Sequence, residues 1–277
     1  MVNRFVLLLV LLTSSAAPAA EVAHAAVKPL AEAHSHNDYL HRRPLLDALD
    51  QGFCGVEADV FLVDGDLLVA HDRKDVKPGF TLRSAYLEPL AQRVRGKVGI
   101  FATPGTRLQL LVDVKKDGAA VYEVLKRQLE PYSDILTRFG PSGISTGAVT
   151  VVISGDRAVE RIAADAERLC AVDGRLAQLE DGSPAALYPL MSESWPFRWR
   201  GEGAMPSADR EKLAAIVSKA HAQGRKVRFW GGPDRLSAWE EMKRAGVDLI
   251  NTDRLPELGA FLRGEPQPAA KVVEETQ

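Results

Sequence analysis

Residues 30–72 read LAEAHSHNDYLHRRPLLDALDQGFCGVEADVFLVDGDLLVAHD, and this stretch decides the fold. The run from Gly55 to Leu62 has the composition of a strand, in which alternate side chains point to the same face. Glu57 and Asp59 therefore point together. Two neighbouring carboxylates repel each other, and a divalent cation between them relieves the repulsion. Oxygen ligands suit Mg²⁺ or Ca²⁺, so we expect a cation site here; the alternative is that both acids face solvent on an edge strand.

Apolar runs that end in histidine lie on both sides of this acid pair. Leu30 to His34 precedes it, and Leu67 to Asp72, which ends in His-Asp, follows the turn signal Asp64-Gly65. Three predicted strand ends thus place His, Glu/Asp and His within one short segment. Imidazole titrates near neutrality, so histidines around a bound metal suit the roles of general base and general acid.

The order of these groups, a histidine, then Glu-x-Asp, then His-Asp, resembles the superfamily of glycerophosphodiester phosphodiesterases and phosphatidylinositol-specific phospholipases C. The block that begins HSHNDY looks like a bacterial and fungal branch of it, and it is similar, more distantly, to the sphingomyelinase D group. Residues 246–258, GVDLINTDRLPEL, resemble the last strand and helix of the superfamily. The resemblance spans nearly the whole mature chain and implies an α/β fold, a single-domain (β/α)₈ TIM barrel.

The resemblance also implies residue roles. Asp113, in a DVK triplet similar to the family's DLK, would be the third metal ligand, and Lys115 would neutralise a phosphate oxygen. His71 matches the second catalytic histidine. The first is either His34, which ends the first strand, or His36, which lies in the HND part of the block. The candidate residues are therefore catalytic His34, His36 and His71, metal-binding Glu57, Asp59 and Asp113, and substrate-binding Asn37, Lys115 and Trp230.

One departure from the superfamily leaves the substrate open. Ordinary glycerophosphodiesterases carry an HRG…PEN signature, and HSHNDY stands in its place here. No arginine follows the first histidine, and the PEN glutamate is missing. Trp230, at the end of a predicted strand, is expected either to form an apolar wall for the substrate or to pack in the core.

Strand-like and helix-like runs alternate about eight times along the chain, which is typical of α/β folds. Polar or aromatic residues appear at one strand end after another, at the end where barrel enzymes place their active sites. The predicted strands are residues 30–34, 55–62 with 67–71, 109–115, 149–154, 170–172, 187–191, 226–230 and 247–251, and the main predicted helices are 44–51, 84–94, 119–129, 157–166, 209–223, 235–245 and 255–262.

The ends of the chain differ from its centre. Residues 1–26 combine Arg4, an apolar run from Phe5 to Leu12 and a small-residue region, which together predict a cleaved signal peptide and a secreted or periplasmic protein. Residues 27–264 would form the barrel, and residues 265–277, rich in Pro and Glu, a disordered tail. Cys54 and Cys170 either pair in an oxidising compartment or stay as buried free thiols, and we favour the thiols.

We therefore expect a secreted, metal-dependent phosphodiesterase that cleaves a glycerophosphodiester or a phospholipid head-group diester with one Mg²⁺ or Ca²⁺. A net charge of −2 without basic runs gives no reason to expect a nucleic-acid partner. The substrate would be a small-molecule or lipid phosphodiester, and any transient membrane contact would need exposed loop residues such as Phe80 or Phe101. The alternatives are a phospholipase D-like enzyme, a non-catalytic barrel that binds phosphorylated ligands, and a zinc hydrolase.

Overall fold

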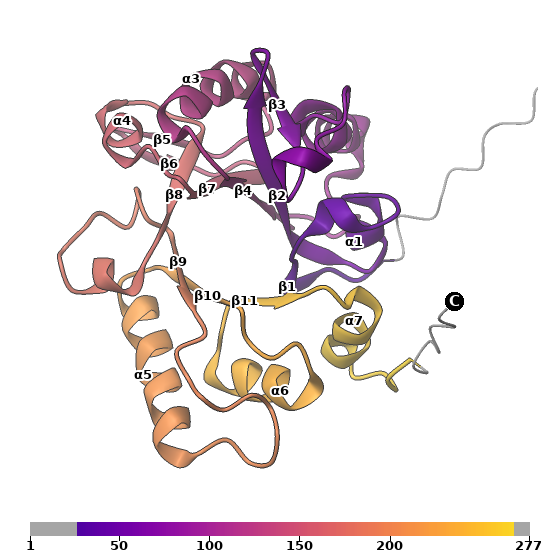
Figure 1. Cartoon of the computed structure of the whole chain (residues 1–277), viewed down its shortest axis with the longest axis vertical. Coiled ribbons are helices and arrows are strands. Elements are labelled where there is room, and N and C mark those ends of the chain that lie inside the picture. Colours follow the sequence, from indigo (N-terminus) through magenta and orange to yellow (C-terminus); the bar gives the residue numbers. More distant parts are fainter. Residues whose placement is uncertain (1–26, 269–277) are drawn as a thin grey trace, which may run out of the picture.

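Eight parallel strands close into a barrel in the computed structural model, which describes residues 27–268 apart from the side chains of residues 97 and 98. Figure 1 shows these strands as a ring with the helices outside it. The first strand closes the ring by pairing in parallel with both the second and the last. The barrel strands are β1 (Leu30–Ser35), β2 (Phe53–Val63), β4 (Leu108–Val114), β7 (Val149–Gly155), β8 (Cys170–Gly174), β9 (Leu190–Ser194), β10 (Lys226–Trp230) and β11 (Leu249–Thr252). The predicted (β/α)₈ barrel is confirmed.

In the described part of the chain, six α-helices lie in the connections between these strands and a seventh follows the last strand. They are α1 (Leu46–Asp50), α2 (Glu88–Arg93), α3 (Gly118–Leu129), α4 (Val159–Ala164), α5 (Ser207–Ala222), α6 (Leu236–Ala245) and α7 (Leu255–Arg263). The predicted helix over 84–94 is only partly α-helical, because wider π turns, Arg83–Leu87 and Val94–Val98, flank α2. Among the described residues, no helix has the length and apolar character needed to cross a membrane.

A hairpin extends the barrel beyond β2. Strand β3 (Asp66–Val69) pairs with β2 in antiparallel orientation, and the turn is Asp64-Gly65, both with positive φ, as the sequence predicts. A second, separate hairpin joins β5 (Arg138–Gly140) to β6 (Gly143–Ser145). The β2–β3 hairpin carries the chain past the barrel rim to His71.

The sixth barrel strand lies later in the chain than predicted. It runs from Leu190 to Ser194, so Glu193 lies within the strand and not after it. The predicted start, Leu187, instead closes a turn whose backbone N–H groups bond to Pro184 O. The predicted signal peptide (1–26) and residues 269–277 of the predicted tail lie outside the described residues.

The apolar core has two parts. The larger part fills the space between the barrel and its helices and includes the outward side chains of β2, Val56, Ala58 and Val60. The smaller part lies inside the barrel and consists of Leu111, Val152, Leu190 and Leu249. Cys54 and Cys170 are buried free thiols, as favoured from the sequence. Leu111, Val152, Leu190 and Leu249 form the inner layer of the barrel. This layer supports the polar side chains that follow on the same strands.

Candidate active site

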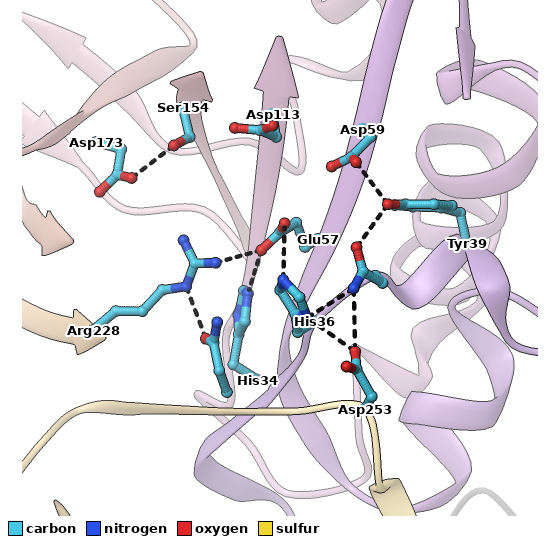
Figure 2. Close-up of polar contacts among 12 residues, drawn as sticks. His34, His36, Tyr39, Glu57, Asp59, Asp113, Ser154, Asp173, Arg228 and Asp253 are labelled. Atoms are coloured by element: carbon cyan, nitrogen blue, oxygen red, sulfur yellow. Dashed lines mark hydrogen bonds and ion pairs between the residues drawn. The ribbon is translucent and has the colours of Figure 1, made fainter. Parts of the chain in front are cut away.

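Polar side chains fill the carboxyl end of the barrel interior (Figure 2). Because side chains alternate along a strand, the residue two positions after each inner-layer apolar residue also points inward. Asp113, Ser154, Ser192 and Asn251 follow the inner-layer residues in this way, and the neighbouring strands add His34, Glu57, Asp59, Asp173 and Arg228. Parallel strands thus bring most of the predicted site to one end, as the family resemblance implies.

Asp59 and Asp113 form one side of this cluster. They are direct register partners on β2 and β4. Lys115 Nζ bridges them, at 2.6 Å from Asp59 Oδ2 and 2.8 Å from Asp113 Oδ2. Burial tends to lower the pKa of Lys115, but the two carboxylates outweigh burial and raise it. The lysine is therefore a fixed positive charge at the barrel mouth.

His71 and Tyr39 also contact Asp59. His71 Nδ1 lies 3.1 Å from Asp59 Oδ2, and the Tyr39 hydroxyl lies 2.6 Å from the same oxygen. The His71 ring is 58% exposed, so its other nitrogen is accessible to a ligand. Burial, with the charge of Glu57, raises the pKa of Asp59 even though Lys115 and Tyr39 oppose the shift. Tyr39 was not among the candidate residues predicted from the sequence.

Glu57 occupies the centre of the barrel mouth. The Arg228 guanidinium donates to Glu57 Oε2, and His34 Nε2 lies 3.4 Å from the same oxygen. Arg228 Nε also donates to Asn251 Oδ1 at 2.8 Å. Burial alone would raise the pKa of Glu57, but the Arg228 charge and the His34 contact hold it well below its usual range. Glu57 is therefore an ionised carboxylate inside the barrel.

The two histidines of the first strand have different surroundings. His34 is fully buried, and burial lowers its pKa to about 4 despite the contact with Glu57. His36 is partly exposed, with Nδ1 2.9 Å from Asp253 Oδ1 and Nε2 3.9 Å from Glu57 Oε1. Burial tends to lower the pKa of His36, but Asp253 and Glu57 raise it overall. The accessible histidine is His36.

Asn37 connects the two halves of the site. Its left-handed backbone (φ 48°) begins the 3₁₀ turn that carries Tyr39. The Asn37 Oδ1 atom accepts from the Tyr39 hydroxyl at 2.7 Å, and Nδ2 lies 3.3 Å from Asp253 Oδ1. Asn37 thus positions site residues, and its predicted contact with the substrate stays a prediction.

Two glycines make room for these side chains. A Cβ on Gly55 would lie 2.6 Å from His34 Nδ1, so only glycine leaves space for the buried ring. A Cβ on Gly155, which has φ +70°, would lie 2.8 Å from Asp113 Oδ1 and 2.2 Å from Val114 O. The glycines in β2 and β7 therefore leave room for the His34 ring and the Asp113 carboxylate.

A metal site at Glu57, Asp59 and Asp113 is consistent with the donors present. As the side chains stand, no three His, Cys, Asp or Glu groups in the described part of the chain gather tightly enough to hold an ion, because Lys115 and Arg228 occupy the acids. Asp59 Oδ1, however, is buried with no hydrogen-bond partner. Three carboxylates, one with an unpartnered buried oxygen, are the hard oxygen donors that Mg²⁺ or Ca²⁺ requires.

A second polar group, on β7 and β8, lies level with Asp113 and was not predicted. Asp173 is fully buried on β8, accepts from Ser154 Oγ at 2.8 Å, and lies 3.2 Å from Arg175 Nη1. The strand predicted from the sequence ended at Val172. The signal was present, because Ala171-Val172-Asp173 repeats the pattern of an apolar strand that ends in an acid, as in Val112-Asp113.

Other predicted residues lie at the margin of the site or away from it. Trp230 is 41% exposed at the end of β10. Asp72, which follows His71 in the sequence, lies 3.9 Å from Lys74 Nζ at the surface. A cavity of about 500 Å³ lies at the opposite, amino end of the barrel beside Lys226 and Gln109. A cavity of about 120 Å³ adjoins His36 and Asp253.

Comparison with known proteins agrees with this architecture. A family model described as the AIM6-like phosphodiesterase domain matches residues 22–171, and a model of the glycerophosphoryl diester phosphodiesterase family matches residues 226–256. The altered inheritance of mitochondria protein 6 homolog of Arthroderma benhamiae is 30% identical over 251 residues, which cover 79% of this chain and 80% of that protein. Altered inheritance of mitochondria protein 6 of Eremothecium gossypii is 31% identical over 273 residues, covering 85% and 70%.

The similarity to solved structures is weaker. The crystal structure of a glycerophosphodiester phosphodiesterase from Parabacteroides distasonis aligns with a TM-score of 0.49 and 17% identity, covering 84% of this chain and 97% of that one. The predicted superfamily is nevertheless confirmed, because the first family model covers more than half of the chain and the second its closing strands. The chain belongs to the AIM6-like phosphodiesterase family.

Proposed function

We propose that this protein is a metal-dependent phosphodiesterase that hydrolyses a glycerophosphodiester or a phospholipid head-group phosphodiester. One observation carries the proposal: two accessible histidines flank the Glu57–Asp59 pair, one at each carboxylate. His36 lies beside Glu57, and His71 lies beside Asp59. A general base and a general acid on either side of an anion-neutralising centre are what cleavage of a phosphodiester needs.

The charged groups at the mouth would bind the phosphodiester. Glu57, Asp59 and Asp113 would hold the divalent cation, which when bound neutralises phosphate charge and polarises a phosphoryl oxygen. Lys115 Nζ, between Asp59 and Asp113, pairs with a non-bridging phosphate oxygen. Arg228 keeps Glu57 ionised from inside the barrel.

The histidines would move the protons. Asp253 holds His36 at Nδ1, so Nε2 removes the proton from the nucleophile, either water or a hydroxyl of the substrate. The nucleophilic oxygen forms a bond to phosphorus as the bond to the leaving oxygen breaks, and His71 protonates that oxygen. Attack by water gives a phosphomonoester, and attack by the substrate's own hydroxyl gives a cyclic phosphate.

A second candidate is cleavage of a lipid diester by a phospholipase D-like reaction. Exposed apolar side chains at the rim favour it, because Leu40, beside Tyr39, is 69% exposed and Trp230 is 41% exposed. An acyl chain on the substrate would cover both. A soluble glycerophosphodiester would not need them.

The test is a hydrolysis panel with the purified protein. Glycerophosphocholine, glycerophosphoinositol, lysophosphatidylcholine and a nitrophenyl diester are each incubated with EDTA and then with Mg²⁺, Ca²⁺ or Zn²⁺. Metal-dependent turnover of any diester supports the proposal, and the preferred substrate decides between the two candidates. If folded protein cleaves no diester with any metal, the proposal fails and a ligand-binding barrel takes its place.

We also propose that the protein is exported, because residues 1–26 have the charge and apolar pattern of a signal peptide. The measurement is amino-terminal sequencing of the protein recovered from the medium or periplasm of its own cells. A mature start near residue 21 or 27 is expected. Retention of the full-length chain inside the cell contradicts the proposal.

A further inference from the structure

The cavity at the amino end of the barrel lies on the far side of the inner apolar layer from the candidate active site. Its volume is about 500 Å³, and Leu249 of the inner layer forms part of its wall. None of the candidate active-site residues lines it. Small-molecule sites in proteins typically measure about 300–1,000 Å³. The cavity is therefore large enough for a ligand that does not reach the site at the other end.

The strands bring polar side chains into this cavity. Gln109 lies two positions before Leu111, and Thr150 lies two positions before Val152, so strand alternation points both into the barrel. Gln109 and Thr150 are direct register partners on β4 and β7. Lys226, the first residue of β10, lines the same cavity. The amino end of the barrel thus has polar groups of its own.

The Gln109 amide lacks a partner that a ligand would supply. Gln109 is 8% exposed, and its Nε2 is buried with no hydrogen-bond partner. Its neighbour Thr150, by contrast, has its hydroxyl 2.7 Å from Thr137 Oγ1. Buried donors are usually satisfied, because an unmade hydrogen bond costs free energy. The last torsion of a glutamine side chain is soft, so the amide can rotate to donate to an oxygen in the cavity.

The charge of the lining favours an anion. Arg107 and Lys226 are basic, and no Asp or Glu is among the described residues that line the cavity. Neither basic side chain forms an ion pair within residues 27–268, whereas Arg43, Arg210 and Lys219 pair with nearby acids on the surface. Two cations without acidic neighbours in a concave wall create a positive potential.

The hairpin of β5 and β6 gives the cavity an apolar side. Phe139 and Ile144 are register partners across this hairpin, and both line the cavity. Phe139 is buried, but Ile144 is 50% exposed. An inorganic ion would leave the isoleucine in water, whereas an apolar group on the ligand would cover it. The lining therefore suits a molecule with one charged end and one apolar end.

We propose that this cavity is a second binding site, for a small organic anion with one carboxylate or phosphate head group and an apolar body. Lys226 and Arg107 pair with the head group, Gln109 donates a hydrogen bond to it, and Ile144 packs on the body. The inference goes beyond the proposed phosphodiesterase activity and does not depend on it, because no residue of that site takes part.

Calorimetric titration of the purified protein tests the proposal with probes that share one alkyl chain. The probes are octanoate, octyl phosphate, octanol and octyltrimethylammonium, each kept below the concentration at which it forms micelles. Octanoate and octyl phosphate should bind at least about tenfold more tightly than octanol, as expected for hydrogen bonds to a charged group. The cationic probe should not bind. Comparing the two anions shows which head group the site prefers.

Substitutions locate the bound anion. Lys226→Met keeps most of the side-chain length and removes the charge, so octanoate affinity should fall by about tenfold. Gln109→Leu removes a neutral donor, and the expected loss is about three- to tenfold. The matched control is Lys77→Met, at an exposed lysine in the loop after β3 that also has no ion pair in the described chain. Its octanoate affinity should equal that of the wild type.

Four results would overturn the proposal. The first is no binding of octanoate by the folded wild type, and the second is binding of octanol as tight as that of octanoate. The others are an unchanged octanoate affinity in folded Lys226→Met and an equal loss in Lys77→Met. Lys226 is exposed, so its variant decides the matter even if Gln109→Leu fails to fold.

Discussion

The barrel interior contains two successive layers on the same four strands, and they have opposite chemistry. The lower layer is the apolar group Leu111, Val152, Leu190 and Leu249. Two residues further along each strand, the side chains are Asp113, Ser154, Ser192 and Asn251. Strand geometry is the same in both layers, so the fold does not require the upper layer to be polar. The difference indicates that the lower layer stabilises the barrel and the upper layer serves chemistry.

The upper layer carries a cost in stability that the lower layer does not. Asp59 Oδ1, His34 Nδ1 and Asn251 Nδ2 are buried there without hydrogen-bond partners. Each such group costs about 1–3 kcal/mol relative to a satisfied one. Proteins keep such costs where function needs them, so substitutions in the two layers should separate activity from stability.

The largest expected effect is on activity, at His71. His71→Ala should lower kcat by about 10²–10⁴-fold, the usual contribution of a general acid, because the leaving oxygen loses its proton donor. The free energy of unfolding should change little, since the ring is mostly exposed. Diester turnover and urea denaturation measure the two effects. His221→Ala, at a surface histidine paired with Asp248, is the control and should leave turnover unchanged. Unchanged turnover in His71→Ala would remove this residue from the mechanism.

Substitutions at His34 and His36 should also separate an effect on activity from an effect on stability. His36→Gln should lower kcat by about 10²–10⁴-fold, because the accessible base is lost. His34→Gln should mainly lower the free energy of unfolding, by about 1–3 kcal/mol, because His34 is buried and partners Glu57. Turnover per folded molecule, measured beside denaturant unfolding, checks both variants. The reverse assignment, with His34 essential and His36 dispensable, would place the base deeper in the barrel.

The lower layer should show the opposite pattern. Leu111→Ala should lower the free energy of unfolding by about 2–5 kcal/mol, because it leaves a cavity in a fully buried cluster. Turnover of the folded fraction should stay close to the wild-type value. Chemical denaturation and diester assays below the unfolding transition measure the two quantities. A variant that is stable but inactive would show that the layers are not separate.

The smallest expected effect lies outside the barrel, at Glu241. Arg210 holds both of its carboxylate oxygens, at 2.8 and 2.9 Å, and with Arg244 lowers the pKa of Glu241 to about 2. A lowered pKa in the folded state means that the ion pair stabilises the protein above the ordinary glutamate pKa and loses its effect as the pH falls towards 2. Glu241→Gln should therefore cost about 1–2 kcal/mol at pH 7, since the arginines are half exposed, and this cost should fade as the pH falls through about 2. Unfolding midpoints across this pH range measure the difference, and a cost independent of pH contradicts the ionic origin.

Much of the fold was predictable because apolar strands and helices alternate in the sequence and because the HSHNDY block resembles a known superfamily. The placement of the three acids in the site was also predictable from local pattern, since Glu57 and Asp59 alternate within one strand and Asp113 ends another. Strand β9 was placed three residues too early, because Leu187 is apolar but closes a turn. Local sequence does not show that such a turn bonds back to Pro184.

The partners of the site residues were not predictable, because they come from distant parts of the chain. Asp253 meets His36 across 217 positions, and Arg228 meets Glu57 across 171. Tyr39 reaches Asp59 only because Asn37 turns the chain through a left-handed conformation. The choice between His34 and His36 depended on burial, which is a property of the closed barrel.

The most direct test of the central claim is Asp59→Asn, with diester turnover and the free energy of unfolding measured on the same sample. Asp59 lies at the contact of Lys115, Tyr39 and His71, and asparagine keeps its shape while removing its charge. If the upper layer serves phosphodiester cleavage, turnover falls at least about a hundredfold while unfolding changes by no more than about 1 kcal/mol. Turnover close to the wild-type value in folded Asp59→Asn would contradict the account.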